Sequence, residues 1–409
     1  MTDIFINLPA EIGYITETLN KDGHEAYIVG GCVRDSLLGV KPKDWDICTS
    51  AIPEQTIKCF ENHHIIQTGL QHGTITLMLN HQPFEITTYR RDGIYSDNRR
   101  PDTVEFVNNL REDLSRRDFT VNSMAYNQNN GLIDFFDGEK DLKNNIIRCV
   151  GNADKRFNED ALRIMRALRF SSVLGFSIED KTSDSIFKNK SLLQNIAVER
   201  ISVELNKLIT GTGAFDILRK YTSVIAEFIP EIMSLNESDL YNILKSMEFA
   251  PANVILRLAV LFHEFNPDTA CDILKRLKYD NNIVNTVKKL VLYHDEEIVP
   301  DRINIKRWLN KIGENIFRSL IEVKKAKDYK DESLFEILEL LNEIIEQKQC
   351  FCLKDLVVNG DDLIDMGVFE GIKIKLILNQ LLDMVIDEKI DNDKTKLLEI
   401  AGNININNL

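Results

Sequence analysis

The chain has 409 residues, of which 44% are hydrophobic and 28% are charged, and its formal net charge at pH 7 is -14. This length exceeds a single hydrophobic core, so we expect roughly two to four domains. The acidic balance argues against a protein that coats nucleic acid through bulk positive charge. No apolar run is long enough to span a bilayer. The acidic N-terminal stretch lacks the hydrophobic region of an export signal, which predicts a cytoplasmic protein with reduced cysteines.

A predicted helix over residues 9–20 precedes the segment that carries the strongest functional signal, residues 27–48. This segment reads as an apolar strand, a Gly-Gly turn, a short helix and a second strand. Gly30 and Gly31 would let the backbone approach a phosphate group closely. The start of the next helix, which carries Arg34, favours negative charge. The segment therefore predicts a phosphate-binding turn.

Two aspartates close this segment. Because successive side chains of a strand point to opposite faces, Asp44 and Asp46 project together. Two carboxylates on one face can hold Mg²⁺, which proteins bind through one or two carboxylates plus substrate phosphates. Such a pair alone is more often a solvated strand edge. Its conjunction with the glycine turn and Arg34 predicts metal-assisted nucleotide transfer.

The motif GGCVRD followed by KDWDI resembles the head domain of the class II tRNA nucleotidyltransferases, or CCA-adding enzymes, and of the bacterial poly(A) polymerases. Both belong to the DNA polymerase β-like nucleotidyltransferase superfamily. The resemblance implies an α+β multidomain protein, in which a head with a mixed sheet and helices precedes an all-α neck, body and tail. We expect the head over residues 1–150, the neck over 151–215, the body over 216–300 and a tRNA-binding tail over 301–409.

A third carboxylate is predicted in a hairpin of residues 73–80 and 83–89, which both alternate in polarity. Glu85 lies in the second strand, and the hairpin could bring it beside Asp44 and Asp46. From the residues alone, a surface glutamate is the commoner outcome. The resemblance implies that Glu85 completes a set of three catalytic carboxylates and helps to deprotonate the attacking 3′-hydroxyl of the RNA.

Two further motifs follow in the head. Residues 90–106 are polar and rich in turn formers, and they resemble the family's flexible loop, which enzymes that add only CC lack. Arg116, Arg117 and Asp118 begin an RRDFT motif. An arginine fork suits a triphosphate, and a carboxylate accepts hydrogen bonds from ribose hydroxyls. An N-capping cluster is the alternative. The motif favours Arg117 and Asp118 as nucleotide-binding residues.

A helix is predicted over residues 156–170, with Asp160 and Arg163 side by side on its surface. The carboxylate would accept a hydrogen bond from the exocyclic amine that cytosine and adenine share, and the guanidinium would donate to the neighbouring ring nitrogen. Matching of charge to the helix dipole is the alternative. The segment EDALR resembles the family motif EDxxR, which implies that Asp160 and Arg163 select the base. Arg166 and Arg169 match further nucleotide-binding positions.

The remainder of the chain shows amphipathic helical patterns. Glu199 and Arg200 lie in a segment that resembles the last neck motif, where they would support the base-reading helix. Residues 302–330 are rich in lysine and arginine, which indicates either a solvated helical face or an RNA contact. His263 and His294 raise the question of an HD-type metal phosphohydrolase, but only the second precedes an aspartate, so structural histidines are favoured.

Together the motifs predict a Mg²⁺-dependent, template-independent enzyme that adds the terminal CCA to tRNA from CTP and ATP and releases pyrophosphate. An enzyme that adds only the final A would carry the same loop. A poly(A) polymerase is a further alternative, disfavoured because the chain has no strongly basic extension. A catalytically silent RNA-binding protein on the same scaffold would have lost a carboxylate, and all three are present.

Overall fold

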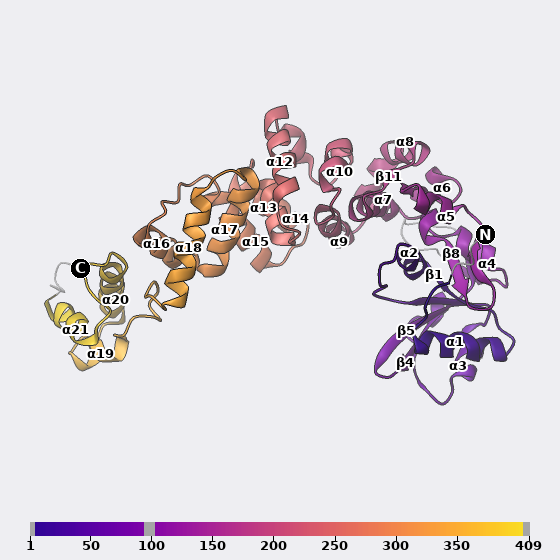
Figure 1. The fold of residues 1–409 in the computed structure, drawn as a ribbon, viewed down its shortest axis with the longest axis horizontal. Coiled ribbons are helices and arrows are strands. Elements are labelled where there is room, and N and C mark those ends of the chain that lie inside the picture. The colour runs from indigo at the N-terminus through magenta and orange to yellow at the C-terminus, as the bar shows by residue number, and fades with distance from the viewer. Residues whose placement is uncertain (1–4, 94–102, 404–409) are drawn as a thin grey trace. The chain divides into compact units, whose positions relative to one another are not determined.

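Figure 1 shows the elements of the computed structural model, which describes residues 5–93 and 103–403. The chain divides into two compact units, Met1–Ser234 and Leu235–Leu409. The first unit contains the sheets and the helices that follow them. In the described part of the second unit, every regular element is a helix. This arrangement confirms the predicted fold class. None of the described helices is long and apolar enough to cross a membrane.

The first unit is built around a mixed sheet of seven strands in the order β3-β4-β5-β2-β1-β8-β9. Its strands are β1 Ala26–Val29, β2 Asp46–Thr49, β3 His64–Ile66, β4 Thr74–Leu79, β5 Gln82–Thr88, β8 Met124–Asn127 and β9 Gly131–Asp134. Two small sheets pair β6 Arg90–Asp92 with β7 Val104–Phe106, and β10 Ile146–Ile147 with β11 Ser177–Ile178. The centre of the predicted flexible loop, between β6 and β7, lies outside the described residues.

The helices of the first unit flank this sheet and then continue the chain. Those among the strands are α1 Ala10–Lys21, α2 Gly31–Leu37, α3 Pro53–Cys59, α4 Leu110–Ser115 and α5 Gly138–Lys143. Those after the large sheet are α6 Ala153–Glu159, α7 Leu162–Leu174, α8 Asp180–Asn189, α9 Val198–Ile209, α10 Ala214–Lys220 and α11 Thr222–Ile225. The predicted apolar face of α1 is confirmed, because Ile12, Ile15 and Leu19 are fully buried. Each such side chain contributes about 1.5–3 kcal/mol to folding.

The predicted hairpin is present as the antiparallel pair of β4 and β5. Asn80 and His81 form its two-residue turn, and both have positive φ values, 49° and 62°. Such a turn requires the left-handed region at both central residues, which asparagine tolerates well. On its other side β5 runs parallel to β2, so that Asp46 is directly opposite Glu85. This register confirms the expected proximity of Glu85 to Asp46.

The prediction of one helix over residues 156–170 is wrong in one respect, because the structure divides this segment at Asp160. Helix α6 ends at Glu159 and α7 begins at Leu162. Asp160 itself is extended, with φ -135° and ψ 104°. Its carboxylate oxygen Oδ1 accepts a hydrogen bond from the Leu162 N–H at 3.1 Å. An aspartate side chain that binds the backbone in this way competes with helix propagation and starts a new helix instead.

The second unit is a series of helices: α12 Glu237–Phe249, α13 Val254–Phe262, α14 Pro267–Arg276, α15 Asn281–Tyr293, α16 Arg302–Ile312, α17 Glu314–Lys327, α18 Ser333–Glu346, α19 Gly360–Asp365, α20 Gly371–Ile386 and α21 Lys394–Asn403. Asparagine or aspartate caps several of their N-termini, as Asn253 does for α13 and Asp301 for α16. These side chains satisfy N–H groups that have no partner within the helix. The last three helices share a small core of their own that includes Leu363, Leu381 and Leu397.

The basic segment of residues 302–330 is largely paired with acidic side chains of the same unit. Arg302 lies 2.6 Å from Glu343, and Lys306 lies 2.9 Å from Glu388. Further pairs are Arg307–Asp387, Lys311–Glu296, Arg318–Glu314 and Lys327–Asp295. The sequence predicted either a solvated helical face or an RNA contact, and did not predict these ion pairs. Any RNA contact by these cations has to compete with the ion pairs that they already make.

The two histidines of the suspected metal site lie together in the second unit. Their rings meet edge to face, with centroids 5.4 Å apart. In the described residues, no three His, Cys, Asp or Glu side chains are grouped so that they could hold a metal ion. Burial, reinforced by the Lys327 ammonium, lowers the pKa of His294 to about 4. Burial also lowers the pKa of His263. Both rings are therefore neutral at pH 7.

Acidification should destabilise the second unit through His294. The pKa of this histidine is about 4 in the folded chain and about 6.5 in an unfolded one. The unfolded state therefore binds more protons in this range, and the free energy of unfolding should fall as the pH drops from about 6.5 to about 4. Urea titrations across this range would measure the loss. His294→Leu, which has no ring to protonate, should reduce it, and an unchanged pH dependence would contradict the prediction.

Candidate active site

The pairing of two neighbouring strands places two of the three predicted carboxylates, Asp46 and Glu85. Strand β2 begins at Asp46, and Asp44 precedes it by two residues. Glu85 projects from β5 opposite Asp46. Asp44, Asp46 and Glu85 are all exposed, whereas the residues that follow Asp46 in β2 are buried. Strand β2 is thus exposed at Asp46 and buried beyond it, so Asp46 lies at the surface at one end of the sheet.

The surroundings of Asp46 disfavour its charged form. Partial desolvation raises the pKa of Asp46, the Arg117 guanidinium opposes this shift, and the Asp44 carboxylate adds to it. A carboxylate in this state gains free energy when a cation is bound beside it. Two oxygen-rich side chains plus substrate phosphates are the usual ligand set of Mg²⁺. The residues present therefore fit such an ion.

The glycine turn lies against Arg117. Gly30 has φ 84°, and a Cβ atom at this position would lie 3.1 Å from Arg117 Nη1. A side chain would therefore be both strained and crowded at Gly30. The next residue, Gly31, begins helix α2. The turn leaves its backbone open beside a guanidinium, as the binding of a phosphate group requires.

Arg34 is held on three sides. Its Nη1 donates to Asn122 Oδ1 at 2.6 Å, and its Nε donates to Asp35 Oδ1 at 2.9 Å. Its guanidinium carbon lies 5.1 Å from the centroid of the Phe170 ring. The side chain is only 8% exposed. This arginine is therefore fixed in place before any substrate arrives.

The side chain of Asp118, which follows α4 in the chain, contacts helix α7. The carboxylate accepts hydrogen bonds from Arg166, with Nε 2.8 Å from Oδ2, and from the Asn122 amide at 3.2 Å. Burial alone would raise the pKa of Asp118, but the Arg166 guanidinium outweighs it and lowers this pKa to about 2. The pair is thus ionised at neutral pH. Breaking a buried pair of this kind costs about 3–5 kcal/mol.

The two predicted base-reading residues are not paired with each other in the structure. Asp160 Oδ2 lies 3.3 Å from Arg200 Nη2, which supports it as expected for Arg200. Arg163 instead donates through Nη1 to Glu159 Oε2 at 2.8 Å, and through Nη2 to the carbonyl oxygen of Arg116 at 2.9 Å. The expectation that Asp160 and Arg163 lie side by side on one continuous helix is wrong, because the helix begins anew between them.

Arg169, from the same helix, is held by residues that the sequence analysis did not single out. Its guanidinium carbon lies 3.6 Å from the Phe170 ring centroid, and its Nε lies 2.8 Å from Glu204 Oε2. Glu204 is 5% exposed and also lies 3.9 Å from Arg166. Glu204 occurs four residues after Arg200, on the apolar side of the predicted helix. A charged residue at such a position was the available signal.

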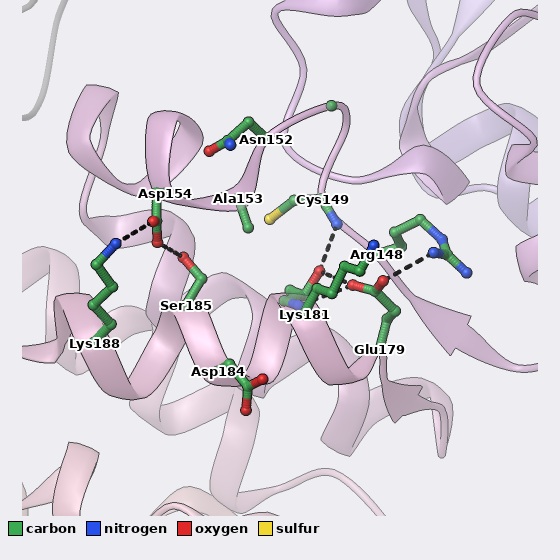
Figure 2. Close-up of a pocket in the computed structure, with 12 residues that line it drawn as sticks. Arg148, Cys149, Asn152, Ala153, Asp154, Glu179, Lys181, Asp184, Ser185 and Lys188 are labelled. Atoms are coloured by element: carbon green, nitrogen blue, oxygen red, sulfur yellow. Dashed lines mark hydrogen bonds and ion pairs between the residues drawn. The ribbon is translucent and has the colours of Figure 1, made fainter.

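A separate cavity of about 590 Å³ lies at the start of α6 and α8, and none of the predicted site residues lines it. Figure 2 shows the residues that line this cavity. Four of its charged side chains form two pairs. Asp154 accepts from Lys188 and Ser185, and Glu179 accepts from Arg148. Because no predicted site residue lines this cavity, the candidate active site remains the one at β2, β5 and α7.

Models of three known domains match this chain in succession. The poly A polymerase head domain matches residues 26–148. The probable RNA and SrmB-binding site of polymerase A matches residues 175–234. A putative second domain of tRNA nucleotidyltransferases matches residues 250–401. The matches extend over most of both structural units.

Full-length relatives agree with these domains. The CCA-adding enzyme of Ligilactobacillus salivarius is 37% identical over 393 residues, which cover 95% of this chain and 94% of that protein. The CCA-adding enzyme of Oceanobacillus iheyensis is 35% identical over 394 residues, which cover 94% and 95%. The crystal structure of the Bacillus stearothermophilus CCA-adding enzyme in complex with CTP matches with a TM-score of 0.81, at 30% identity and 98% coverage of each chain. The chain therefore belongs to the family of CCA-adding enzymes.

Proposed function

We propose that this chain adds C, C and A in turn to the 3′ end of tRNA, with CTP and ATP as substrates and pyrophosphate as the leaving group. No nucleic-acid template is needed, and the reaction takes place in the cytoplasm, where these substrates are present. The observation that carries the proposal is the register that sets Asp46 opposite Glu85, with Asp44 just before the strand. In-line transfer of a nucleotide requires carboxylates that hold a metal ion and cationic side chains that bind the phosphates.

The carboxylates act on the reacting atoms in this proposal. Asp44 and Asp46 hold Mg²⁺, which supplies Lewis acidity at the α-phosphate when it is bound. Glu85 accepts or shares the proton of the attacking 3′-hydroxyl. A bond forms between the RNA oxygen and the α-phosphorus, and the bond to pyrophosphate breaks. The partial desolvation of Asp46 raises its pKa, which supports a site where a bound cation would stabilise the ionised carboxylate.

The triphosphate and sugar are held by the elements around the glycine turn. The backbone of Gly30 and Gly31 lies close to the phosphates, and Arg34 and Arg117 neutralise the charge of the phosphates. Asp118 binds the ribose hydroxyls. Support comes from Arg117, which lies 3.1 Å from the position of a Gly30 Cβ. These contacts are common to CTP and ATP and therefore carry no base selectivity.

Base selection falls to the start of α7. Asp160 accepts from the exocyclic amine of cytosine or adenine, and Arg163 donates to the adjacent ring nitrogen. Arg166 and Arg169 complete the nucleotide contacts from the same helix. Because uracil and guanine present a carbonyl where the amine is required, they leave the carboxylate without a donor. A buried polar group without a partner costs roughly 1–3 kcal/mol.

Incorporation assays should give C, C and A in order and then stop. The substrates are tRNAs that end before CCA, after C and after CC, each supplied with CTP, ATP or both in the presence of Mg²⁺. Labelled products separated to single-nucleotide resolution measure the additions. The names of the relatives support this outcome over the alternatives. Incorporation of A on the CC-ending tRNA alone would identify an A-adding enzyme, and open-ended A tails would identify a poly(A) polymerase. Bound RNA without incorporation would identify a silent scaffold.

A further inference from the structure

Asp113, in helix α4, is a carboxylate with no solvent exposure that the proposed function does not use. Arg116 donates to its Oδ1 through Nε at 3.0 Å and through Nη2 at 2.8 Å. The backbone N–H of Arg90 donates to the same oxygen at 3.2 Å. The other oxygen, Oδ2, lies 3.5 Å from Arg117 Nη2. One buried carboxylate therefore holds two consecutive arginines.

The charge of Asp113 is compensated rather than removed. Burial of a carboxylate favours its neutral form and costs several kcal/mol unless opposite charges surround it. Here the guanidinium groups of Arg116 and Arg117 outweigh the burial and hold the pKa of Asp113 below its usual range. The two oxygens divide between the arginines, so each guanidinium is oriented by its own half of the carboxylate.

One terminal nitrogen of Arg117 pairs with Asp113, and the other faces the glycine turn. Its Nη2 faces Asp113, whereas its Nη1 lies 3.1 Å from the position of a Gly30 Cβ. Within the described parts of the chain, Asp113 is the one carboxylate that forms an ion pair with this guanidinium. A fork fixed at one nitrogen keeps the other nitrogen in a defined direction and loses little further freedom when it binds a ligand.

We propose that Asp113 is a positioning residue for the triphosphate, which acts by holding Arg117 against the turn at Gly30. The inference rests on the proposed role of Arg117 as a triphosphate ligand. Because the triphosphate is common to both substrates, Asp113 affects CTP and ATP equally and leaves the choice of base and the binding of tRNA unchanged. A residue needed only for folding would affect all of these together.

The test compares Asp113→Asn with a matched control. Asp141 is likewise buried in the first unit, at 2% exposure, and accepts hydrogen bonds from Thr120 and Arg148. Asp141→Asn therefore removes a buried, paired carboxylate away from the turn. Inorganic tripolyphosphate serves as a probe of the triphosphate subsite, measured as a competitive inhibitor. Asp113→Asn should raise its inhibition constant, and the KM for both CTP and ATP, by about tenfold, while Asp141→Asn leaves all three near wild type.

A double substitution separates the two claims. In an Arg117→Ala background, Asp113→Asn should cause little further loss of tripolyphosphate binding, because the side chain it positions is gone. If Arg117→Ala itself leaves this binding unchanged, the assignment of Arg117 fails. If Arg117→Ala weakens binding and Asp113→Asn does not, the inference about Asp113 fails.

Asp113→Glu provides a variant that keeps the charge. Its longer side chain displaces the carboxylate, so we expect a folded protein, with wild-type tRNA affinity and an unchanged ratio of CTP to ATP use, in which tripolyphosphate binding is weakened several-fold. Wild-type tripolyphosphate binding in Asp113→Glu would overturn the proposal even if Asp113→Asn did not fold.

Discussion

Asp46→Asn should abolish the incorporation of both CTP and ATP while tRNA remains bound. The amide keeps the shape of the side chain but removes the charge that holds the cation in the proposed function. Metal stabilisation of a phosphoryl transition state contributes several kcal/mol, and each 1.36 kcal/mol corresponds to a factor of ten, so we expect a loss of at least about 10³-fold. The same loss is expected for Asp44→Asn, because neither carboxylate alone completes the site.

The stability of the same variant should move in the opposite direction from its activity. The pKa of Asp46 is raised in the folded chain, chiefly through partial desolvation, so its ionised form opposes folding at neutral pH. Asp46→Asn should therefore leave the thermal midpoint unchanged or raise it slightly. Single-turnover incorporation, tRNA binding and thermal unfolding would be measured side by side. Glu54→Gln, on the exposed start of α3, serves as the control and should retain activity. Substantial activity in Asp46→Asn would refute the metal assignment.

The sequence was sufficient to predict the hairpin that carries Glu85 because short-range rules determine it. Alternating polarity identified the strands of the hairpin, and the two-residue turn at Asn80 and His81 sets their register. What periodicity could not supply was the parallel pairing of β5 with β2, which is a contact between segments far apart in the chain. The family resemblance was needed to choose Glu85 over an ordinary surface glutamate.

The start of α7 could not be predicted from the sequence because local competition decides it. A 3.6-residue pattern continues through Asp160, and helix propensity alone favours one uninterrupted helix. The side chain of Asp160 instead binds the Leu162 N–H and begins a new helix. Glu159 then remains on α6 and pairs with Arg163. Which of two adjacent acids would bind the backbone N–H of Leu162 and which would bind Arg163 depends on tertiary contacts that no sequence period records.

The buried ion pairs show the same limit. Glu204 and Asn122 were passed over because each stands in a motif whose other members carried the family signal. Glu204 pairs with Arg169, and Asn122 bridges Arg34 and Asp118. Both residues fix the direction of an arginine, and only Glu204 has a sequence signal, its place on the apolar side of α9. Their positions follow from the packing of α7 and α9 and from the turn after α4, and only the folded chain brings these together.

Asp160→Asn should relax or reverse the selection of the base. In the wild type, Oδ1 accepts from Leu162 and Oδ2 faces Arg200, so the two oxygens have different tasks. An asparagine can keep the first hydrogen bond with its carbonyl oxygen and present its amide nitrogen in place of Oδ2. A donor at this position opposes the amines of cytosine and adenine and matches the carbonyl of uracil. Discrimination against UTP relative to CTP should fall by about 10²-fold, since both a lost and a gained hydrogen bond contribute.

The ratio of kcat/KM for UTP and CTP measures this change directly. Asp154→Asn, which removes a carboxylate from α6 at its exposed pair with Lys188, is the matched control and should keep wild-type selectivity.

Arg163 can read a base only after it releases a protein group, because both of its terminal nitrogens are bound to protein groups in the structure. To read a base through them, it must exchange one of these partners for the ligand. Glu159→Gln, which weakens the hold on Nη1, should therefore increase affinity for CTP and ATP without admitting UTP, whereas equal gains for all bases would show that Arg163 does not read the base.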